Sequence, residues 1–333
     1  MMNRNDPAIQ WLLESQDPSV RYFTLADILD EPSDSRRVRA VRRQIPEGPC
    51  VRALLAGQKA AKRTSVQSLA THAGGFGVHP YKKWDGAHWR LVSLVELGIA
   101  ADDPRARAAV DQVLHWLTGE THRCRIRHIN GLTRRCASQE GNALAVCCRL
   151  GLIGDDRVKY LARSLIEWQW PDGGWNCDKD ARARHSSFYE SLAPMWGLIE
   201  YHRATGDADS LVAAQRAAAF FLQHRLFRSE KNGNVINPEW LQLHYPLYWH
   251  YDILQALVIL SRLGPLTDPR VQEALDIIEQ KRLPDGRWRA EGFYWRTPGK
   301  RSSNVEVVDW GRRGPNEMIT LNALRVLKAA GRL

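Results

Sequence analysis

The chain contains two cysteines and a histidine whose side chains could bind a metal ion. Cys136, Cys177 and His185 supply two thiols and an imidazole. Zinc is usually held by cysteine, histidine and carboxylate side chains, and a catalytic zinc keeps one coordination position open. These three residues therefore predict a zinc site. The alternative is that both cysteines are small buried side chains and that His185 caps a helix.

A second group of residues could transfer protons without a metal. His250 and Asp252 lie close together in the segment Tyr248-Trp-His-Tyr-Asp. Histidine titrates near neutral pH, and a neighbouring carboxylate can orient its ring. In this alternative His250 is the base and Asp252 orients it, whereas in the zinc alternative Asp252 completes the metal shell or orients His250. His185 and Tyr189 are further candidate catalytic residues.

Aromatic and basic side chains near these residues could hold a ligand. Aromatic faces attract cations, but they also fill thick helical cores, so both roles are open for each of them. The candidates for ligand binding are His88, Trp89, Arg184, Phe188, Trp249 and Tyr251. A basic rim is expected from the loop 296–304 together with Arg182, Arg184, Arg312 and Arg313.

Such distant residues can meet only if the fold brings repeated units together. Three segments share one pattern, in which an apolar run ends on glycine and a second run begins on aspartate. Glycine suits the left-handed end of a helix, and aspartate accepts hydrogen bonds from the free amides at a helix start. The pairs are Gly98 with Asp103, Gly151 with Asp155, and Gly264 with Asp268.

The two helices of each pair differ in where their apolar residues fall. Residues 253–263 are apolar almost all around the helix, which predicts a buried inner helix, whereas residues 268–281 are amphipathic, which predicts an outer one. Inner helices are expected at about 20–30, 86–98, 138–151, 186–203, 250–264 and 316–330. Outer helices are expected at about 7–15, 35–45, 103–118, 155–168, 207–225 and 268–281.

Six alternating pairs predict an all-α fold, an (α/α)6 toroid in a single domain. An open solenoid is the alternative, because stacked helix pairs also bury their faces by repetition. In a toroid the inner helices all run in the same direction, so their first residues gather at one mouth of the ring. Cys136, Cys177, His185, His250 and Asp252 would then lie near one another. The amino-terminal ends of the helices would also favour an anion at this mouth.

Two loops share a pattern that resembles a known repeat. Gln169-Trp-Pro-Asp-Gly-Gly-Trp175 and Gln280-Lys-Arg-Leu-Pro-Asp-Gly-Arg-Trp288 both read Gln…Pro-Asp-Gly-x-Trp, and Gln58 followed by Gly74-Gly-Phe is a degenerate third copy. Pro-Asp-Gly is typical of turns. The pattern resembles the repeat of the terpenoid cyclase and protein prenyltransferase superfamily, which includes the squalene cyclases with their QW-type repeats.

The resemblance implies an α/α toroid over residues 51–333, with residues 1–50 as an N-terminal helical repeat pair packed onto it. It also implies an apolar ligand of isoprenoid diphosphate type in the central cavity, and a transferase or cyclase reaction (isomerase or lyase) at the mouth. Prenyltransferases of the superfamily use zinc, and the segment that leads to His185 is similar to their zinc-binding region. The Asp-x-Asp-Asp acid of the cyclases is incomplete, because Asp178-Lys-Asp-Ala181 lacks the last aspartate. We favour an enzyme on these grounds.

Composition restricts the class of protein further. The chain has 333 residues, of which 44% are hydrophobic and 25% charged, and this balance excludes a disordered chain. It has no apolar run long enough for a membrane helix, no signal-peptide pattern at its start, and no C-x-x-C pair among its six cysteines. We therefore expect a cytoplasmic protein.

The formal net charge of +10 leaves two non-catalytic alternatives. One is a toroid that binds a lipid or a peptide in its cavity, with a membrane surface as a further partner. The other is a basic helical-repeat protein that binds nucleic acid through surface arginines such as Arg134 and Arg135. Nucleic acid is the less favoured partner, because the sequence contains no zinc-finger or RNA-recognition motif.

Overall fold

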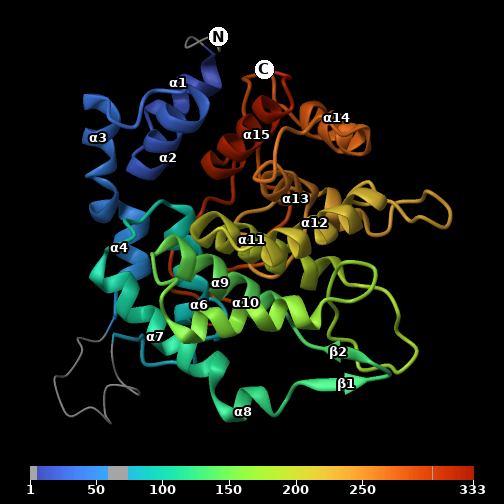
Figure 1. The fold of residues 1–333 in the computed structure, drawn as a ribbon. Coiled ribbons are helices and arrows are strands. Elements are labelled where there is room, and N and C mark those ends of the chain that lie inside the picture. The colour runs from blue at the N-terminus through green and yellow to red at the C-terminus, as the bar shows by residue number, and fades with distance from the viewer. Residues whose placement is uncertain (1–5, 59–73, 302) are drawn as a thin grey trace.

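A computed structural model describes residues 6–58, 74–301 and 303–333, in which two kinds of helix alternate along the chain (Figure 1). The inner helices are α2 (Pro18–Phe23), continued by the π-helix η1 (Thr24–Ile28), α6 (Ala87–Glu96), α9 (Ser138–Arg149), α11 (Phe188–Thr205), α13 (Ile253–Leu260) and α15 (Glu317–Ala329). The outer helices are α1 (Pro7–Leu13), α3 (Arg36–Arg42), α7 (Pro104–Thr118), α10 (Asp156–Trp168), α12 (Ala208–Gln223) and α14 (Gln272–Gln280).

The other elements are short and lie between the helix pairs. They are η2 (Ile45–Glu47), α4 (Pro49–Leu55), α8 (Glu120–Arg123), β1 (Arg127–Ile129), β2 (Leu132–Arg134), η3 (Pro238–Leu241) and η4 (Pro269–Val271). β1 and β2 form an antiparallel hairpin in which Arg127 pairs with Arg134. Neither α4 nor this hairpin is among the elements predicted from the sequence.

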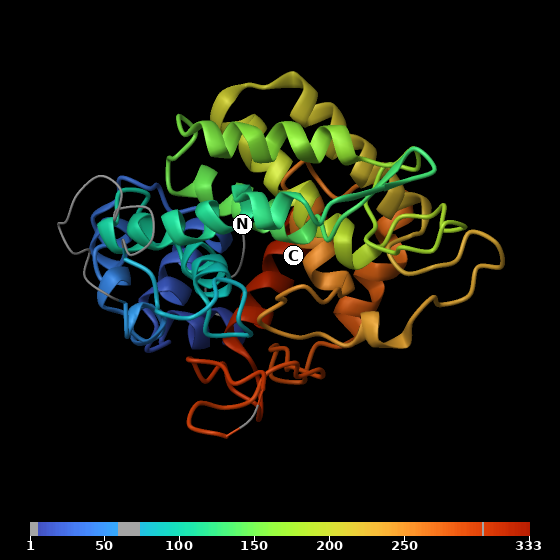
Figure 2. The same ribbon diagram turned by 90° about the horizontal axis from the view of Figure 1, so that it is seen from below.

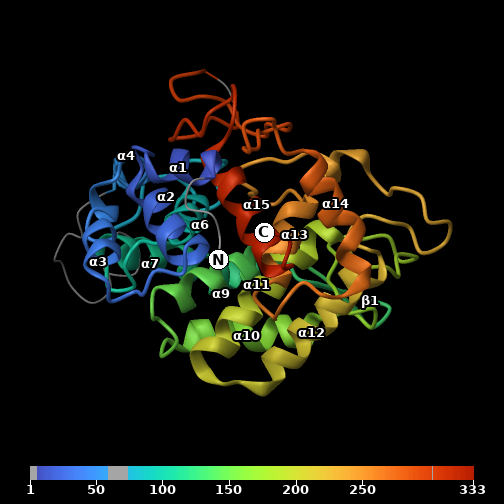
Figure 3. The ribbon, with the colours of Figure 1, turned by 90° about the horizontal axis from the view of Figure 1, so that it is seen from above.

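The inner helices form a closed ring, which Figure 3 shows from above. α6 packs against α9, α9 against α11, α11 against α13, and α13 against α15. α15 packs against α2 and η1. α2 in turn lies beside the end of α6, because a Cβ atom added at Gly98, just after α6, would lie 2.9 Å from the ring of Phe23 in α2. The described chain is therefore an all-α, single-domain (α/α)6 toroid, as predicted, and the open solenoid is excluded.

The first helices of the chain contact its last helix. α1 and α2 both pack against α15, and α1 and α15 lie at the same end of the molecule (Figure 1). The division of the chain into an N-terminal pair (1–50) and a toroid (51–333) stays a prediction. In the part of the chain that the structure describes, no helix has both the length and the apolar character needed to cross a membrane.

Short-range signals set the turns between inner and outer helices. Asp103 accepts hydrogen bonds from the amides of Arg105 and Ala106 over 2.9 and 3.2 Å at the start of α7. Gly98 and Gly151 follow α6 and α9 with φ angles of 76° and 69°, in the left-handed region that glycine occupies without strain. Each turn is therefore determined by residues that lie next to one another in the sequence.

The repeated glutamine–tryptophan loops tie the helices together. The indole nitrogen of Trp175 donates to the carbonyl oxygen of Leu165 in α10 over 2.9 Å, and that of Trp288 donates in the same way to Ile278 in α14 over 2.7 Å. The amide of Gln169 donates to the carbonyl oxygen of Ala213 in α12 over 2.8 Å. Each tryptophan thus holds the loop against the outer helix that precedes it, and Gln169 reaches the next outer helix.

α9 and α11 approach each other closely because each has a glycine at the contact. A Cβ atom on Gly141 would lie 2.3 Å from the backbone nitrogen of Pro194, and one on Gly197 would lie 2.5 Å from the carbonyl oxygen of Gly141. Any larger residue at Gly141 would therefore push the two helices apart. The close contact also brings the first turn of α9 beside the first turn of α11, where Ser138 donates a hydrogen bond to Glu190.

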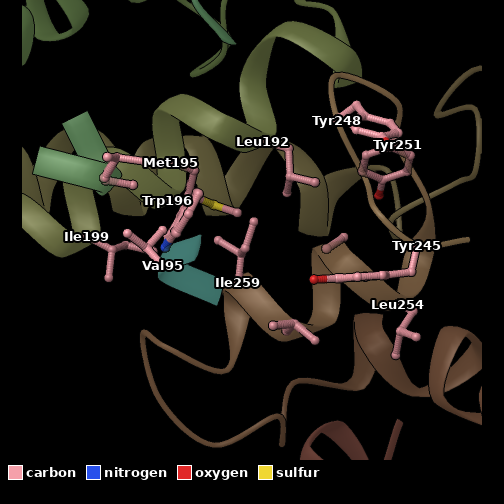
Figure 4. Packing of buried hydrophobic residues seen from close by; sticks show 14 of the residues in the cluster. Val95, Leu192, Met195, Trp196, Ile199, Tyr245, Tyr248, Tyr251, Leu254 and Ile259 are labelled. Carbon is pink, nitrogen blue, oxygen red and sulfur yellow. The ribbon is translucent and has the colours of Figure 1, made fainter. Parts of the chain in front are cut away.

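Side chains fill the middle of the ring. Val95 of α6, Trp196 of α11 and Ile259 of α13 point toward one another in Figure 4. The space that remains there, lined also by the loop 246–248, measures about 30 Å³. An isoprenoid chain needs a large apolar cavity, whereas the larger hollow that reaches these helices, of about 890 Å³, has the charged side chains of Glu96, Arg149 and Arg262 in its lining. The apolar cavity predicted for such a ligand is therefore not found among the described residues.

Candidate functional site

The first residues of the inner helices gather at one end of the ring, which we call the amino-terminal mouth. In Figure 2 the loop before α15 (red), described for residues 291–301 and 303–312, extends beyond the helices at one side of the molecule. The segments that precede α6, α13 and α15 meet at this mouth, and so do the segments that precede α9 and α11. Residues far apart in the sequence therefore share one surface.

Two cysteines and a glutamate form a cluster at this mouth, which we call the thiol cluster. The sulfur atoms of Cys136 and Cys177 and a carboxylate oxygen of Glu190 all lie within 4.8 Å of one another. Cys177 Sγ donates to Glu190 Oε1 over 3.7 Å. The other carboxylate oxygen, Oε2, accepts from the hydroxyl and the amide of Ser138 over 2.8 and 3.1 Å.

Backbone hydrogen bonds explain why the three residues meet. The amide of Arg135 donates to the carbonyl oxygen of Asn176 over 3.0 Å, which places the two cysteine-bearing segments side by side. The chain then folds back beside Trp175, where the amide of Ser187 donates to the carbonyl oxygen of Trp175 over 2.8 Å. This return brings the first turn of α11, with Glu190, to the same place.

The two thiols differ in acidity. A hydrogen bond from the Cys136 thiol lowers the pKa of Cys177 below its usual value. The same hydrogen bond, together with burial, raises the pKa of Cys136, and burial raises the pKa of Glu190. Because the thiolate is the form that binds metals and attacks disulfides, the cluster can bind a metal ion or form a disulfide bond.

The third predicted zinc ligand lies outside the thiol cluster. The side chain of His185 is exposed, and its carbonyl oxygen accepts a hydrogen bond from the Asn176 side chain over 2.8 Å. Glu190 stands where an additional ligand would, and it is not among the ligands predicted from the sequence. Its position in the first turn of a predicted inner helix, next to Tyr189, is the signal that could have identified it.

A groove of about 850 Å³ opens at the same mouth. It lies among the segments that precede α6, α13 and α15, and we call it the basic groove. Its lining residues are Lys83, Trp84, Trp249, His250, Phe293, Tyr294, Trp295, Arg296, Thr297, Lys300, Arg301, Asn304 and Arg312. The rim residues predicted from the sequence that line the groove are Arg296, Thr297, Lys300, Arg301, Asn304 and Arg312. Arg182, Arg184 and Arg313 are not among its lining residues, and Ser302 lies outside the described residues.

The aromatic residues of the basic groove cover one another's faces. The ring of His250 lies between Trp249 and Tyr294, with centroid distances of 3.9 and 3.4 Å. The ammonium group of Lys83 lies 4.7 Å from the centroid of Trp249, and the guanidinium of Arg312 lies 4.6 Å from that of Phe293. The groove therefore offers a ligand mainly cations and ring edges rather than free aromatic faces.

The cations of the basic groove are not neutralised by neighbouring carboxylates. Among the described residues that line it, five are lysine or arginine and none is aspartate or glutamate. Among the described residues none of the five forms an ion pair; Arg312 instead donates to the carbonyl oxygen of Trp295 over 2.7 Å. Burial, together with the charges of His244 and Lys83, lowers the pKa of His250 to about 3. The groove therefore attracts anions.

Asp252 is paired with His244 and not with His250. Its Oδ2 lies 3.0 Å from His244 Nδ1 and accepts from the His244 amide over 3.1 Å, and its Oδ1 accepts from the Gln255 amide over 2.8 Å. Both side chains of this pair are buried. The predicted orientation of His250 by Asp252 is corrected accordingly, because Asp252 is the N-cap of α13 and its carboxylate turns to the free amides of that helix.

Tyr189 lies between the thiol cluster and the basic groove. Its hydroxyl accepts a hydrogen bond from the indole nitrogen of Trp240 over 2.9 Å. Its ring centroid lies 5.9 Å from that of Trp249, which lines the groove, and its neighbour in the chain is Glu190. Tyr189 therefore connects the two parts of the mouth.

The other residues predicted to bind a ligand lie away from the groove lining. His88, Trp89, Phe188 and Tyr251 are buried. The Tyr251 hydroxyl donates to the carbonyl oxygen of Leu226 over 2.7 Å. Arg184 is exposed and donates to the carbonyl oxygen of Ala181 over 2.6 Å. Of the six, Trp249 is the one that lines the basic groove.

A buried ion pair supports the wall next to the thiol cluster. Arg135 Nε donates to Glu140 Oε1 over 2.8 Å, and His122 Nε2 lies 3.1 Å from the same oxygen. Burial alone raises the pKa of Glu140, but Arg135 and His122 outweigh it and hold this pKa below its usual value. The neighbouring Arg134 is buried as well, with its guanidinium 4.4 Å from the centroid of Trp170.

We expect Glu140→Gln to lower the free energy of unfolding by about 2 kcal/mol at pH 7, since it leaves Arg135 without a buried counter-charge. Because the pKa is depressed in the folded state, the wild-type contribution is present above the unfolded-state pKa of about 4.3. It is lost as the pH falls through the lower folded-state pKa. Urea unfolding at pH 6 and pH 3 should show a smaller loss of stability in the variant than in the wild type, and equal losses would contradict the assignment.

A hollow of about 890 Å³ opens at the opposite mouth and reaches Gln255 and Met318 in the first turns of α13 and α15. Its cations have partners within the protein. Arg262 lies 2.7 Å from Glu200, and Arg325 lies 2.6 Å from Asp27. These ion pairs neutralise much of the local charge, so the basic groove is the stronger candidate for an anionic ligand.

Fold and site together define an (α/α)6 toroid with a thiol cluster and a basic groove at its amino-terminal mouth. No family model and no curated protein matches the chain. Among solved structures, the chain is similar to a GH76 alpha-mannanase from Bacteroides thetaiotaomicron, studied as a selenomethionine derivative. The two share 14% sequence identity over 97% of this chain and 85% of that chain, with a TM-score of 0.43.

The assignment to the terpenoid cyclase and protein prenyltransferase superfamily is wrong. No family model supports it, and the apolar central cavity that ligands of the superfamily need is not found among the described residues. The apolar, isoprenoid-type ligand and the transferase or cyclase reaction are wrong with it. The physical reason is that side chains fill the centre of the ring, while the larger hollows at its two mouths are lined by charged residues.

The two non-catalytic alternatives are corrected on similar grounds. A lipid- or peptide-binding toroid would need an apolar central cavity, but the enclosed space there is about 30 Å³ and the larger hollow that reaches the centre is lined by charged side chains such as Glu96, Arg149 and Arg262. A nucleic-acid-binding repeat would need exposed arginines, but Arg134 and Arg135 are buried and bonded to other parts of the protein. The repeat pattern had indicated the fold correctly and the ligand incorrectly.

Proposed function

We propose that the protein binds an acidic carbohydrate, a sugar that carries carboxylate, sulfate or phosphate groups, in the basic groove. The observation that carries this proposal is the set of five cations that line one groove without a carboxylate partner among the described residues. Unpaired cations held close together repel one another, and an anionic ligand removes that repulsion. The similarity to the mannanase is too low to support this proposal.

The size and walls of the groove favour a sugar over other anions. A volume of about 850 Å³ is far larger than a simple inorganic ion needs and is in the usual range for a small organic ligand. A nucleotide base would stack on a free aromatic face, but Trp249, His250 and Tyr294 already stack on one another. Thr297 and Asn304 supply polar groups that can bind sugar hydroxyls.

The lining also restricts the chemistry at the groove. Hydrolysis of a glycosidic bond usually needs two carboxyl groups, one on each side of the bond, and the lining residues include none. Both ring nitrogens of His250 lack a hydrogen-bond partner among the described residues, and the ring is neutral at pH 7. Its lowered pKa makes it a weak base until a bound anion raises that pKa. We therefore propose recognition of the acidic sugar as the function of the groove.

Calorimetric titration tests this proposal. An oligosaccharide of hexuronic acid should bind the purified protein, and a neutral oligosaccharide of equal length should not. Lys300→Glu combined with Arg301→Glu should weaken binding at least about tenfold, and added salt should weaken it in the wild type. Arg36→Glu, which changes an exposed cation on α3, is the matched control and should leave binding unchanged.

Two results would overturn the proposal. The first is equal affinity for the neutral and the acidic sugar. The second is a binding constant that does not respond to charge reversal at Lys300 and Arg301. Inorganic phosphate and a nucleoside triphosphate serve as further probes, and tighter binding of either one than of the sugar would assign the groove to that ligand instead.

The proposed location is the cytoplasm. All six cysteines are free thiols, and the adjacent Cys136 and Cys177 would be prone to oxidation in an oxidising compartment.

A further inference from the structure

We propose that Cys136, Cys177 and Glu190 bind a divalent metal ion of zinc type at the amino-terminal mouth. Their ligand atoms lie within 4.8 Å of one another. Around a tetrahedral zinc, with Zn–S distances of about 2.3 Å and Zn–O distances of about 2.1 Å, ligand atoms lie roughly 3.5–3.8 Å apart. Small side-chain rotations would close that difference, so the cluster is near the geometry that the ion requires.

The charges around the cluster favour a cation. Glu190 forms no ion pair within the described ranges, although its side chain is half-buried. The nearby Glu140, by contrast, is paired with Arg135 at 2.7 Å. A buried carboxylate without a counter-charge is costly. A divalent ion would supply the missing positive charge to Glu190 and to the two thiols that face it.

Neighbouring residues hold the carboxylate in the orientation that a metal needs. Glu190 Oε2 accepts two hydrogen bonds from Ser138, one from its hydroxyl and one from its amide. Oε1 is then directed to Cys177, 3.7 Å away. Metal-binding carboxylates are usually fixed by such outer hydrogen bonds. The amide belongs to the first turn of α9, so the position of Glu190 is coupled to the close packing of α9 and α11.

The number of ligands indicates the kind of site. Structural zinc sites have four protein ligands, and catalytic ones have three with one open position. Three protein ligands leave one position for water or for part of a bound molecule. The adjacent Tyr189 contacts Trp249 of the basic groove, with ring centroids 5.9 Å apart, so the open position lies near the proposed sugar site. The metal proposal does not depend on that site.

Metal analysis of the intact, reduced protein tests the inference. After dialysis against zinc and then against metal-free buffer, the wild type should retain about one zinc per chain. Loading with cobalt in place of zinc should produce the absorption of cobalt–thiolate bonds. Cys136→Ser and Cys177→Ser should each lose that absorption and weaken zinc binding at least about 100-fold. Ser138→Ala should weaken binding by about 10- to 100-fold, as for other residues that orient a ligand.

Matched controls separate a metal site from a folding defect. Cys124→Ser changes an exposed cysteine, and His185→Ala changes the exposed histidine predicted as a ligand; both should retain zinc. Circular dichroism of each metal-free variant checks that it has folded, and Glu190→Gln, which has the same size, serves where a cysteine variant does not fold. The inference is overturned if the reduced wild type holds no zinc, or if Cys124→Ser loses zinc as Cys136→Ser does. Formation of a disulfide between Cys136 and Cys177, with no metal uptake after reduction, would also overturn it.

Discussion

Asp252→Ala is expected to destabilise the protein by about 3–5 kcal/mol, among the largest effects of any single substitution in the chain. The carboxylate accepts from the amides of His244 and Gln255 and lies 3.0 Å from His244 Nδ1. Both Asp252 and His244 are buried, so alanine would leave two buried amides without an acceptor and would remove the counter-charge beside His244 Nδ1, which keeps only the carbonyl oxygen of Gln242 at 3.3 Å. The free energy of unfolding, measured with urea at pH 7, gives the effect directly.

Asp268→Ala is the matched control for this prediction. Asp268 also begins a helical segment, where it accepts from the Arg270 amide over 2.8 Å, but it lies near the surface. Its loss should cost only about 1 kcal/mol, the ordinary contribution of an N-cap. If both substitutions cost the same, the His244–Asp252 pair contributes nothing beyond capping. The pair also holds the segment with Trp249 and His250, so Asp252→Ala should weaken binding of the acidic sugar.

Gly141→Ala is expected to cost about 3 kcal/mol, the upper end of the range for overpacking a core. The added methyl group would lie 2.3 Å from the backbone nitrogen of Pro194 and 2.4 Å from the carbonyl carbon of Ala193. Backbone atoms cannot rotate away as a side chain can, so α9 and α11 must separate. Thermal and urea unfolding should both report the loss, although alanine itself favours the helix.

Gly154→Ala is the control for the glycine substitution. No atom lies within 4 Å of the position that its Cβ would take, so the added methyl group has space. Stability should stay within about 0.5 kcal/mol of the wild type. A Gly141→Ala variant as stable as Gly154→Ala would show that the α9–α11 contact is looser than described. Separation of these helices should also move Ser138 away from Glu190 and weaken zinc binding.

The helices and their alternation could be predicted from the sequence because local residues determine them. Asp103 caps α7 through amides two and three residues away, and Gly98 and Gly151 take up left-handed conformations where the apolar runs end. Apolar residues all around residues 253–260 leave that helix no polar face for water, so it must be buried. The six inner and six outer helices follow from these signals.

The candidate site could be predicted only in part, because its contacts join distant segments. The sequence predicted that Cys136 and Cys177 would meet, and they do, through the hydrogen bond between Arg135 and Asn176. It did not include Glu190, which joins them because α9 and α11 pack closely at Gly141. It also paired Asp252 with the nearest histidine in the chain, His250, whereas the carboxylate turns to His244.

The sequence by itself therefore determined an all-α chain of paired helices and the end of the ring at which reactive residues gather. Capping and amphipathic patterns act over a few residues and need no partner. Only the tertiary structure decided that the ring closes on α15, that side chains fill its centre, and that its unpaired cations line a groove at one mouth. Those features depend on which residues pack against one another across the ring, and the spacing of residues in the sequence does not determine those contacts.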